Sequence, residues 1–537
     1  MSLFLRNINV LIQTFLGSPL PTQKQAAKIS PPTPVKFPAC TPEAKKSAAS
    51  RKDDAEVLVP LLQSIQRQTD VQMSHFEALG VHVTSNASHR DILPDPTFLP
   101  PFKDWRAISE EDLSLATTAS KTALSNGMLS PGVQTYQERR KELSIDNTAA
   151  FRTVRRIPPP FAEPAVRLGN AYEFFKNLEI LSGYWDDTTL PSGNGLEEKE
   201  NTGPKEKISP KDVPPQFQLH KRIGNGSELP PEYRQHLLMA FVKLVAYDFG
   251  CSVNYARCEP RLMLTPSTPS KPASYFNSSA TFVYRMPTDR SAARSGILEG
   301  PVATISCRAT TIFSTPAEEC IDFAREIVAI LLTAQQRRRE IQAETQFGVG
   351  KWWTQNPRWG GGTGGPIGRE GDKDIAKVPS PTAVVPERLS TPTETDPVSL
   401  DAAKIGDINR AARGPQVKKI RKNGKTNHER ICEIYRKMLP PTSSWDRKMK
   451  YMSIGRAKGA AHDDIFLVSA LNHHVSVMRA RVPLALLEVL DGGKTEWDGV
   501  KVWRSQWYDL FKAEERIEAM ELVWGMMAYM TRAEEGT

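Results

Sequence analysis

The residue types best suited to chemistry gather near the C-terminal end of the chain. His473 and His474 are adjacent, and residues 462–464 read HDD. Such groups suggest a metal-dependent phosphohydrolase, in which dispersed histidines and aspartates converge on one ion. Residues 466–478 are apolar almost throughout and predict a central buried helix, on which adjacent histidines point about 100° apart. Because two such side chains do not easily bind one ion, we expect core or edge histidines with hydrogen-bond partners and no metal site.

The six cysteines are a second set of candidates, at positions 40, 251, 258, 307, 320 and 432. They form no C-x-x-C pair and no regular framework, which indicates free, mostly buried thiols in a reducing compartment and argues against structural zinc. Cys320 falls near an expected helix start, where the helix dipole favours a thiolate, but Glu318 and Glu319 oppose that charge. We therefore expect no catalytic cysteine, and the sequence predicts no cofactor.

The most distinctive stretch is residues 346–371, which read QFGVGKWWTQNPRWGGGTGGPIGREG. Its glycines formally match G-x-G-x-x-G, but a dinucleotide site needs a strand before them and a helix after them, and here a Pro-rich linker follows. Its tryptophans could stack on unpaired bases or anchor a partner; they are Trp352, Trp353 and Trp359. Because tryptophans beside flexible glycines also bury against their own domain, we interpret the stretch as an aromatic strap.

Positive charge is concentrated in one segment of the chain, whose net charge is +9. Residues 416–460 contain 13 Lys/Arg against three Asp/Glu, a net charge of +10, so the remainder is nearly neutral. The densest part is KKIRKNGK, with Lys418, Lys419, Arg421, Lys422 and Lys425. Such a run neutralises the phosphates of a nucleic acid or contacts another anionic partner. Recognition by a nuclear import receptor and a plain solvated helix end are the alternatives.

Length and composition indicate folded domains separated by disordered segments. The chain has 537 residues, 42 of them proline, and a mean hydropathy of −0.42. It lacks a run of about 18 apolar residues, so we expect no membrane span. The expected division is a flexible leader with a short amphipathic helix (1–52), a helix and an irregular Pro-rich region (53–165), an α+β domain (166–345) with a disordered insertion (186–229), the Trp/Gly strap and a Pro-rich linker (346–415), and the basic segment with a helical domain (416–537).

Periodicity and turn residues predict the elements of these domains. Helices are expected at 53–79, 170–185 and 231–250, and strands at 251–264, 278–286 and 301–313. A further helix should begin at Pro316, with Thr315 as N-cap and Glu318 completing a capping box. This order predicts an α+β fold with a small antiparallel sheet and covering helices. A C-terminal all-α domain is expected to follow, and its last helix should bury Ile517, Met520, Trp524 and Met527.

Five runs resemble a known group of sequences: LSGYWDDTTLP, LVAYDFGCSV, YFNSSATFVYR, KWWTQNPRWGGGTGGPIG and IFLVSALNHHVSVMRARV. The group is an uncharacterised family of filamentous-fungal proteins, and the similarity covers about residues 165–533. Since the family has no known activity, fold or site, the resemblance implies a lineage and no mechanism.

Taken together, these features predict a non-enzymatic interaction protein inside the cell, in the nucleus or the cytoplasm. It would have a protein partner and would contact nucleic acid or another anion through residues 416–460. One alternative is an enzyme whose active site is built from dispersed residues. Another is a mitochondrial accessory protein, because residues 1–20 contain no acidic residue and have an apolar helical face.

Overall fold

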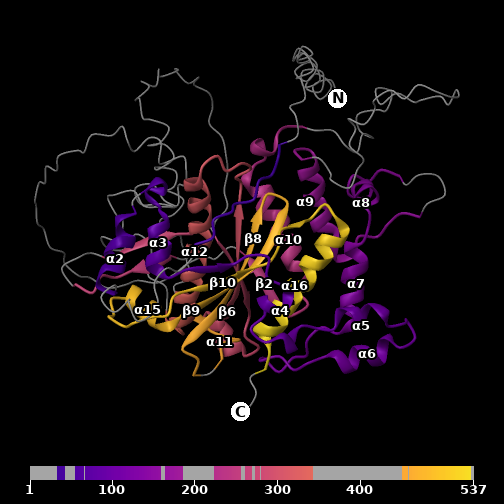
Figure 1. Ribbon diagram of the computed structural model, residues 1–537. Coiled ribbons are helices and arrows are strands. Elements are labelled where there is room, and N and C mark those ends of the chain that lie inside the picture. The colour runs from indigo at the N-terminus through magenta and orange to yellow at the C-terminus, as the bar shows by residue number, and fades with distance from the viewer. Residues whose placement is uncertain are drawn as a thin grey trace, which may run out of the picture.

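The fold is organised around a sheet of nine strands (Figure 1). The computed structural model describes residues 33–42, 55–65, 67–158, 164–185, 223–254, 261–268, 273–278, 280–342, 450–457 and 459–533. The strands of the sheet are β1 (His82–Thr84), β2 (Cys251–Asn254), β5 (Thr281–Arg285), β6 (Ile297–Arg308), β7 (Lys450–Met452), β8 (His462–Leu471), β9 (His474–Pro483), β10 (Lys501–Arg504) and β11 (Tyr508–Asp509). They lie in the order β1-β10-β9-β8-β6-β5-β2, with β11 paired to β9 and β7 paired to β6.

The sheet is mixed. β1 runs parallel to β10, and β6 runs parallel to both β7 and β8, whereas the other pairs are antiparallel. The predicted α+β class is confirmed, but the predicted small antiparallel sheet is wrong in size and in strand direction. Since β7 to β11 come from residues 450–509, the sheet includes a part of the chain for which the sequence predicts an all-α domain.

The clearest departure from the sequence-based prediction is at residues 466–478, expected as a buried helix. They form most of a hairpin, in which β8 and β9 pair along their whole length. Consecutive side chains of β8 enter opposite cores, because Phe466 and Val468 pack on one face of the sheet and Leu467 packs on the other. A strand buried on both faces has no alternation of polar and apolar residues, so periodicity does not distinguish it from a buried helix.

Helices cover one face of the sheet and enclose a large aromatic core. Trp524 is 1% exposed, and its ring contacts those of Trp105, Tyr136 and Phe249. The predicted burial of one face of the last helix is confirmed. The helices of this layer are α4 (His89–Ile92), α5 (Phe102–Ala107), α6 (Leu113–Ser120), α7 (Val133–Leu143), α8 (Asn147–Val154), α9 (Tyr172–Ser182), α10 (Pro231–Ala246) and α16 (Ala513–Thr531).

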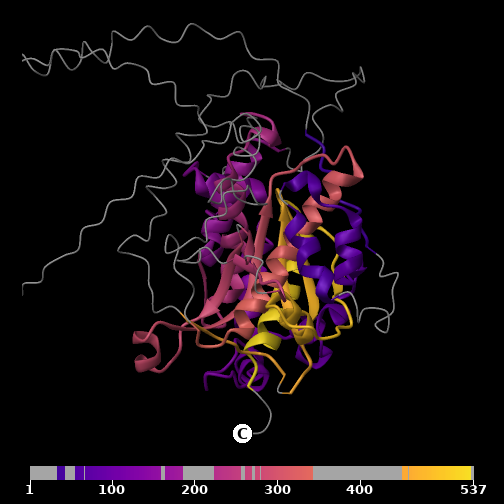
Figure 2. The same cartoon turned by 90° about the vertical axis from the view of Figure 1, so that its left-hand side faces the viewer.

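A second layer covers the opposite face. In the turned view of Figure 2, its first two helices, drawn in indigo, lie across the sheet from the magenta helices α9 and α10. The single helix expected at 53–79 is in fact two, separated by a short turn at Gln68–Asp70. The layer consists of α2 (Ala55–Ser64), α3 (Met73–Leu79), α12 (Pro316–Arg338), α15 (Leu484–Leu490) and a separate hairpin of β3 (Arg261–Leu264) and β4 (Ser274–Asn277); α11 (Arg290–Arg294) precedes β6.

Helix α12 begins where the sequence predicts. Thr315 is its N-cap, and its hydroxyl accepts a hydrogen bond from the backbone N–H of Glu318 (3.3 Å). The Glu318 carboxylate accepts from the backbone N–H of Ser314 (2.7 Å), one residue before the expected partner. This cap, together with Pro316, fixes the start of a 23-residue helix that crosses the sheet. Three buried polar side chains of α12 contact strands of the sheet: Asp322 contacts β6, Glu326 contacts β6 and β8, and Arg337 contacts β8.

Two features of the sequence lie outside the described residues. One is the predicted aromatic strap with Trp352, Trp353 and Trp359, and the other is the predicted basic run with Lys418, Lys419, Arg421, Lys422 and Lys425. Residues 1–32 and 186–222 also lie outside them. Among the described helices, none combines the length and the apolar character that crossing a lipid bilayer requires.

Candidate metal centre

The turn between β8 and β9 holds the two adjacent histidines. His473 lies in the turn and His474 begins β9. Asn472 has a left-handed φ of 58°, which asparagine adopts more readily than most residues. Arg234 Nε donates to Asn472 Oδ1 (2.8 Å), and Asn472 Nδ2 donates to the carbonyl oxygen of Thr310 (3.1 Å). The turn is therefore anchored to α10 and to the residues that follow β6.

Asp509 brings a carboxylate to this turn. Strand β11 pairs with the start of β9, and Asp509 lies opposite His474. Asp509 Oδ1 is 3.9 Å from His473 Nε2, and Asp509 Oδ2 is 3.9 Å from His474 Nε2. One ligand atom from each of the three residues lies within 4.8 Å of the other two. The backbone N–H of Phe511 donates to Asp509 Oδ1 (2.9 Å) and so orients the carboxylate.

Aromatic rings enclose the two imidazoles. His473 is 3% exposed, and its ring centroid lies 5.0 Å from those of Trp185 and Phe511. Phe37 meets the ring of His474 edge-on, with the centroids 5.0 Å apart. Because water is largely excluded from these surroundings, the attraction between a cation and a carboxylate is stronger here than at the surface.

Burial keeps both histidines neutral. It is the main cause that lowers the pKa of His473 well below its ordinary value, and His474 and Lys512 act in the same direction. Burial also lowers the pKa of His474, although Asp509 and Glu515 oppose the change. A neutral imidazole keeps the lone pair that a metal ion needs. At neutral pH the cluster therefore presents two nitrogen donors beside one carboxyl group.

The hydrogen bonds expected for these histidines are incomplete. The Nδ1 atoms of His473 and His474 are both buried and have no hydrogen-bond partner among the described residues. A buried polar atom without a partner costs about 1–3 kcal/mol. Two imidazoles and a carboxylate are the donor set of Zn²⁺ and related divalent ions, which bind such ligands at roughly 2.0–2.2 Å. A shift of about an ångström at each side chain would bring all three onto one ion.

Comparisons with known proteins offer no precedent for this centre. The chain matches no protein-family model, no curated protein and no solved structure. What the cluster does therefore has to be inferred from its own geometry.

The HDD group at residues 462–464 does not join the centre. It begins β8, whereas the turn with His473 follows the other end of that strand. Arg337 Nε donates to Asp463 Oδ2 (2.7 Å), and Asp464 Oδ1 lies 3.4 Å from Arg481 Nε. Both carboxylates are thus engaged in ion pairs. The phosphohydrolase-like arrangement suggested by the sequence is not formed by these residues.

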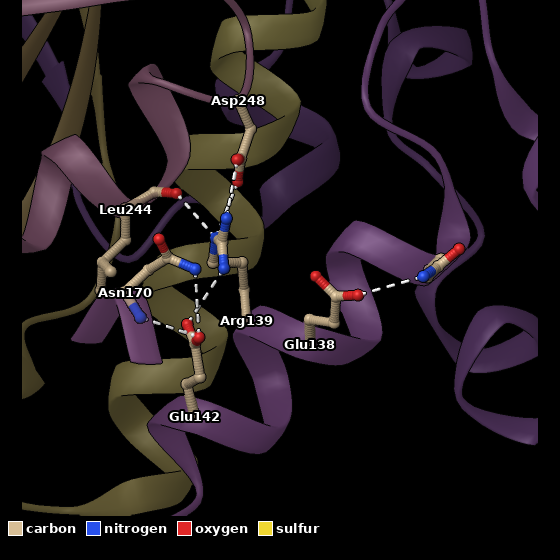
Figure 3. A network of polar contacts seen from close by, with 7 residues as sticks. Glu138, Arg139, Glu142, Asn170, Leu244 and Asp248 are labelled. Carbon is tan, nitrogen blue, oxygen red and sulfur yellow. Dashed lines mark hydrogen bonds and ion pairs between the residues drawn. The ribbon is translucent and has the colours of Figure 1, made fainter. Parts of the chain in front are cut away.

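A second polar network lies between α7 and α10 and is fully engaged in structural contacts (Figure 3). The buried Arg139 side chain donates twice to the Asp248 carboxylate, at 2.8 Å in each case. It also donates to the carbonyl oxygen of Leu244 (3.2 Å) and to Glu142 Oε2 (3.1 Å). Glu142 Oε1 in turn accepts from the backbone N–H of Asn170 (2.9 Å). These bonds fasten α7 to the end of α10, and we assign the network to stability.

A buried ion cluster lies between α12 and the sheet. Arg308 Nε is 2.8 Å from Asp322 Oδ1, and Arg308 Nη2 is 2.8 Å from Glu326 Oε1. Glu326 also pairs with Arg504 and accepts a hydrogen bond from the Ser469 hydroxyl (2.5 Å). Burial opposes ionisation of Glu326, but Arg308 and Arg504 outweigh it and hold the pKa of Glu326 below its ordinary value. Burial raises the pKa of Asp322 in the same cluster, although Arg308 opposes the change. Each carboxyl group has an arginine partner, so the cluster does not by itself call for a ligand.

Asp509 is the residue of the centre that the sequence did not reveal. It belongs to a strand of two residues, too short to show any periodicity. The sequence does contain a signal for the turn that holds the histidines, because Asn472, a residue favoured in hairpin turns, lies between the apolar run IFLVSAL and the valine-rich run VSVMRARV.

Proposed function

We propose that the protein binds a divalent transition-metal ion, with Zn²⁺ the best match to the donors, through His473, His474 and Asp509. The supporting observation is the approach of three ligand atoms to within 4.8 Å of one another. The burial that keeps both imidazoles neutral, and so able to bind a cation, favours the same proposal. The ion would join the β8–β9 turn to β11, and three protein ligands would leave one position for water or an anion.

Calorimetric titration of the metal-free full-length protein with Zn²⁺ tests this proposal. We expect one ion per chain, and a free energy of unfolding higher by about 2.7 kcal/mol when free Zn²⁺ is 100-fold above its dissociation constant. The substitution Asp509→Asn keeps an acceptor for the Phe511 N–H but removes the charge. It should weaken Zn²⁺ binding by at least about 100-fold.

The matched control is His462→Ala, which removes a histidine from the other end of β8 and should leave the affinity unchanged. Absence of a bound ion in the wild-type protein would contradict the proposal. So would equal Zn²⁺ affinity in the wild-type protein and in Asp509→Asn.

We also propose, from the charge distribution, that residues 416–460 contact nucleic acid. The supporting observation is the net charge of +10 in this segment of an otherwise nearly neutral chain. For the whole chain, our proposal is an interaction protein that has a protein partner and is located in the nucleus or the cytoplasm. Recognition of the run by a nuclear import receptor is the alternative. The filamentous-fungal lineage likewise stays a prediction.

Fluorescence anisotropy with a labelled duplex DNA tests the nucleic-acid contact. If all five basic residues of KKIRKNGK contact phosphates, raising the salt from 50 to 200 mM should weaken binding several hundredfold, by the counterion-release slope. Replacing the five by glutamine should abolish most of the binding and most of the salt dependence. Binding that is unchanged by this replacement would assign the contact to another part of the chain.

A further inference from the structure

Two thiols from distant parts of the chain lie next to each other. Cys40 Sγ is 3.7 Å from Cys320 Sγ, although 280 positions separate the two residues. Both are free thiols; Cys40 is half-buried and Cys320 is buried in the first turns of α12. A disulfide has a sulfur–sulfur distance of about 2.05 Å, so side-chain rotation with little backbone movement is enough to join them.

Cys40 belongs to an extended segment, residues 33–42, that has few bonds to the rest of the fold. The backbone N–H of Lys36 donates to the carbonyl oxygen of Thr311 (3.0 Å), and Lys36 Nζ donates to that of Phe313 (3.3 Å). The backbone N–H of Ala39 donates to Glu319 Oε2 (3.2 Å), and the Thr33 hydroxyl accepts from the backbone N–H of Gly226 (3.1 Å). The segment pairs with no strand of the sheet. Such a segment opens locally at a much smaller free-energy cost than the core.

The same segment covers the metal centre. Phe37 lies edge-on against His474, and it stacks on Trp507 with the ring centroids 5.1 Å apart. Because Phe37 is only three residues from Cys40, a covalent bond at Cys40 restrains the ring that shields His474. The thiol pair and the centre are thus joined by one short piece of chain.

We propose that Cys40 and Cys320 form a redox modification site, which a low-molecular-weight disulfide of the glutathione class converts into an intramolecular disulfide. The bond fixes residues 33–42 in the position that covers His474. The modification site stands on the thiol geometry alone, whereas its effect on a bound ion rests on the proposed metal-binding function.

The chemistry is two successive thiol–disulfide exchanges. The Cys40 thiol, the more accessible of the two, loses its proton and attacks one sulfur of the small disulfide; a mixed disulfide forms and one small thiolate leaves. The Cys320 thiol then loses its proton and attacks the Cys40 sulfur, which forms the Cys40–Cys320 bond and releases the second small thiolate. The two departing thiolates take up the two protons, so the protein loses two electrons and the small disulfide gains them. Burial, Cys320 and Glu319 raise the pKa of Cys40 while Arg504 lowers it, so the first step should be slower than with a free thiol.

Mass spectrometry of the full-length protein after incubation with oxidised glutathione tests the proposal. We expect a cross-linked peptide pair that contains Cys40 and Cys320 and has lost two hydrogen atoms. The substitutions Cys40→Ser and Cys320→Ser should each abolish it, and Cys307→Ser, at a cysteine on β6, should not. Glutathione retained on Cys40 without the cross-link, or a cross-link of Cys40 to another cysteine, would overturn the proposal.

Two further measurements separate this inference from the proposed metal binding. Trypsin cleavage after the exposed Lys36 should slow at least about tenfold in the oxidised protein, because cleavage requires local opening of the segment. Unchanged cleavage in the cross-linked protein would show that the bond does not hold the segment in place. Transfer of Zn²⁺ to a chelator should slow by a similar factor. If the cross-link and the protection of Lys36 are seen but no ion binds, the modification site stands and the metal proposal fails.

Discussion

Replacing Arg308 by methionine is expected to lower the free energy of unfolding by roughly 3–5 kcal/mol, the usual cost of breaking a buried ion pair. Arg308 lies 2.8 Å from oxygens of both Asp322 and Glu326, and all three side chains are at most 2% exposed. Without the guanidinium, Glu326 keeps its ion pair with Arg504, whereas Asp322 loses its ion pair with Arg308. Because methionine fills much of the space of the arginine side chain, the decrease in the free energy of unfolding reports mainly the lost charge and not a cavity. Urea denaturation of both proteins at pH 7 gives the difference.

The second variant for this cluster removes a carboxyl group together with the arginine. Arg308→Met combined with Asp322→Leu should recover about 1–3 kcal/mol of the loss, because the neighbouring charges couple. If Arg308→Met alone unfolds at the urea concentration of the wild-type protein, ion pairing does not stabilise this part of the core.

Replacing Arg337 by methionine should have an effect of similar size, again about 3–5 kcal/mol. Arg337 is buried and donates to both oxygens of Asp463, at 2.7 and 3.1 Å. It also donates to the carbonyl oxygens of Pro301 (2.8 Å) and Ile454 (3.0 Å). Its loss leaves a carboxyl group and two carbonyls in the interior without these donors, and it removes a link between α12 and β8.

The next residue of α12 provides a matched control. The Arg338 side chain is 28% exposed and lies 3.3 Å from Glu488 and 3.4 Å from Asp491, both also partly exposed. Surface pairs of this kind contribute about 0–1 kcal/mol, so Arg338→Met should be nearly silent in the same urea experiment. If Arg337→Met and Arg338→Met lower the free energy of unfolding equally, burial of the Arg337–Asp463 pair does not explain its contribution to stability.

The helices were predictable where one face is apolar and the ends are marked. Helix α12 has Thr315 and Pro316 at its start, and α10 begins with two prolines followed by an apolar run. Helix α16 buries the stripe that its spacing predicts, including Trp524. In each case the information is local, because capping and helical periodicity involve residues close in the sequence.

The hairpin and the metal centre depend on contacts that are not local. Strands β8 and β9 are covered on both faces, and this removes the alternation that would have distinguished them from a helix. The predicted helix would have pointed His473 and His474 in different directions. In the structure, the turn between β8 and β9 brings both side chains toward Asp509. Likewise, no spacing rule relates Cys40 to Cys320, which meet only because residues 33–42 lie against the start of α12.

The two ends of the segment 343–449 meet at one place on the fold. The backbone N–H of Ile341 donates to the carbonyl oxygen of Tyr451 (2.9 Å), so the residues that follow α12 lie beside β7, which itself pairs with β6. The described residues on either side of this segment are therefore adjacent in the fold, although they are far apart in the sequence. Because the segment has to begin and end at this one place, a change in its length does not require α12 or β7 to move.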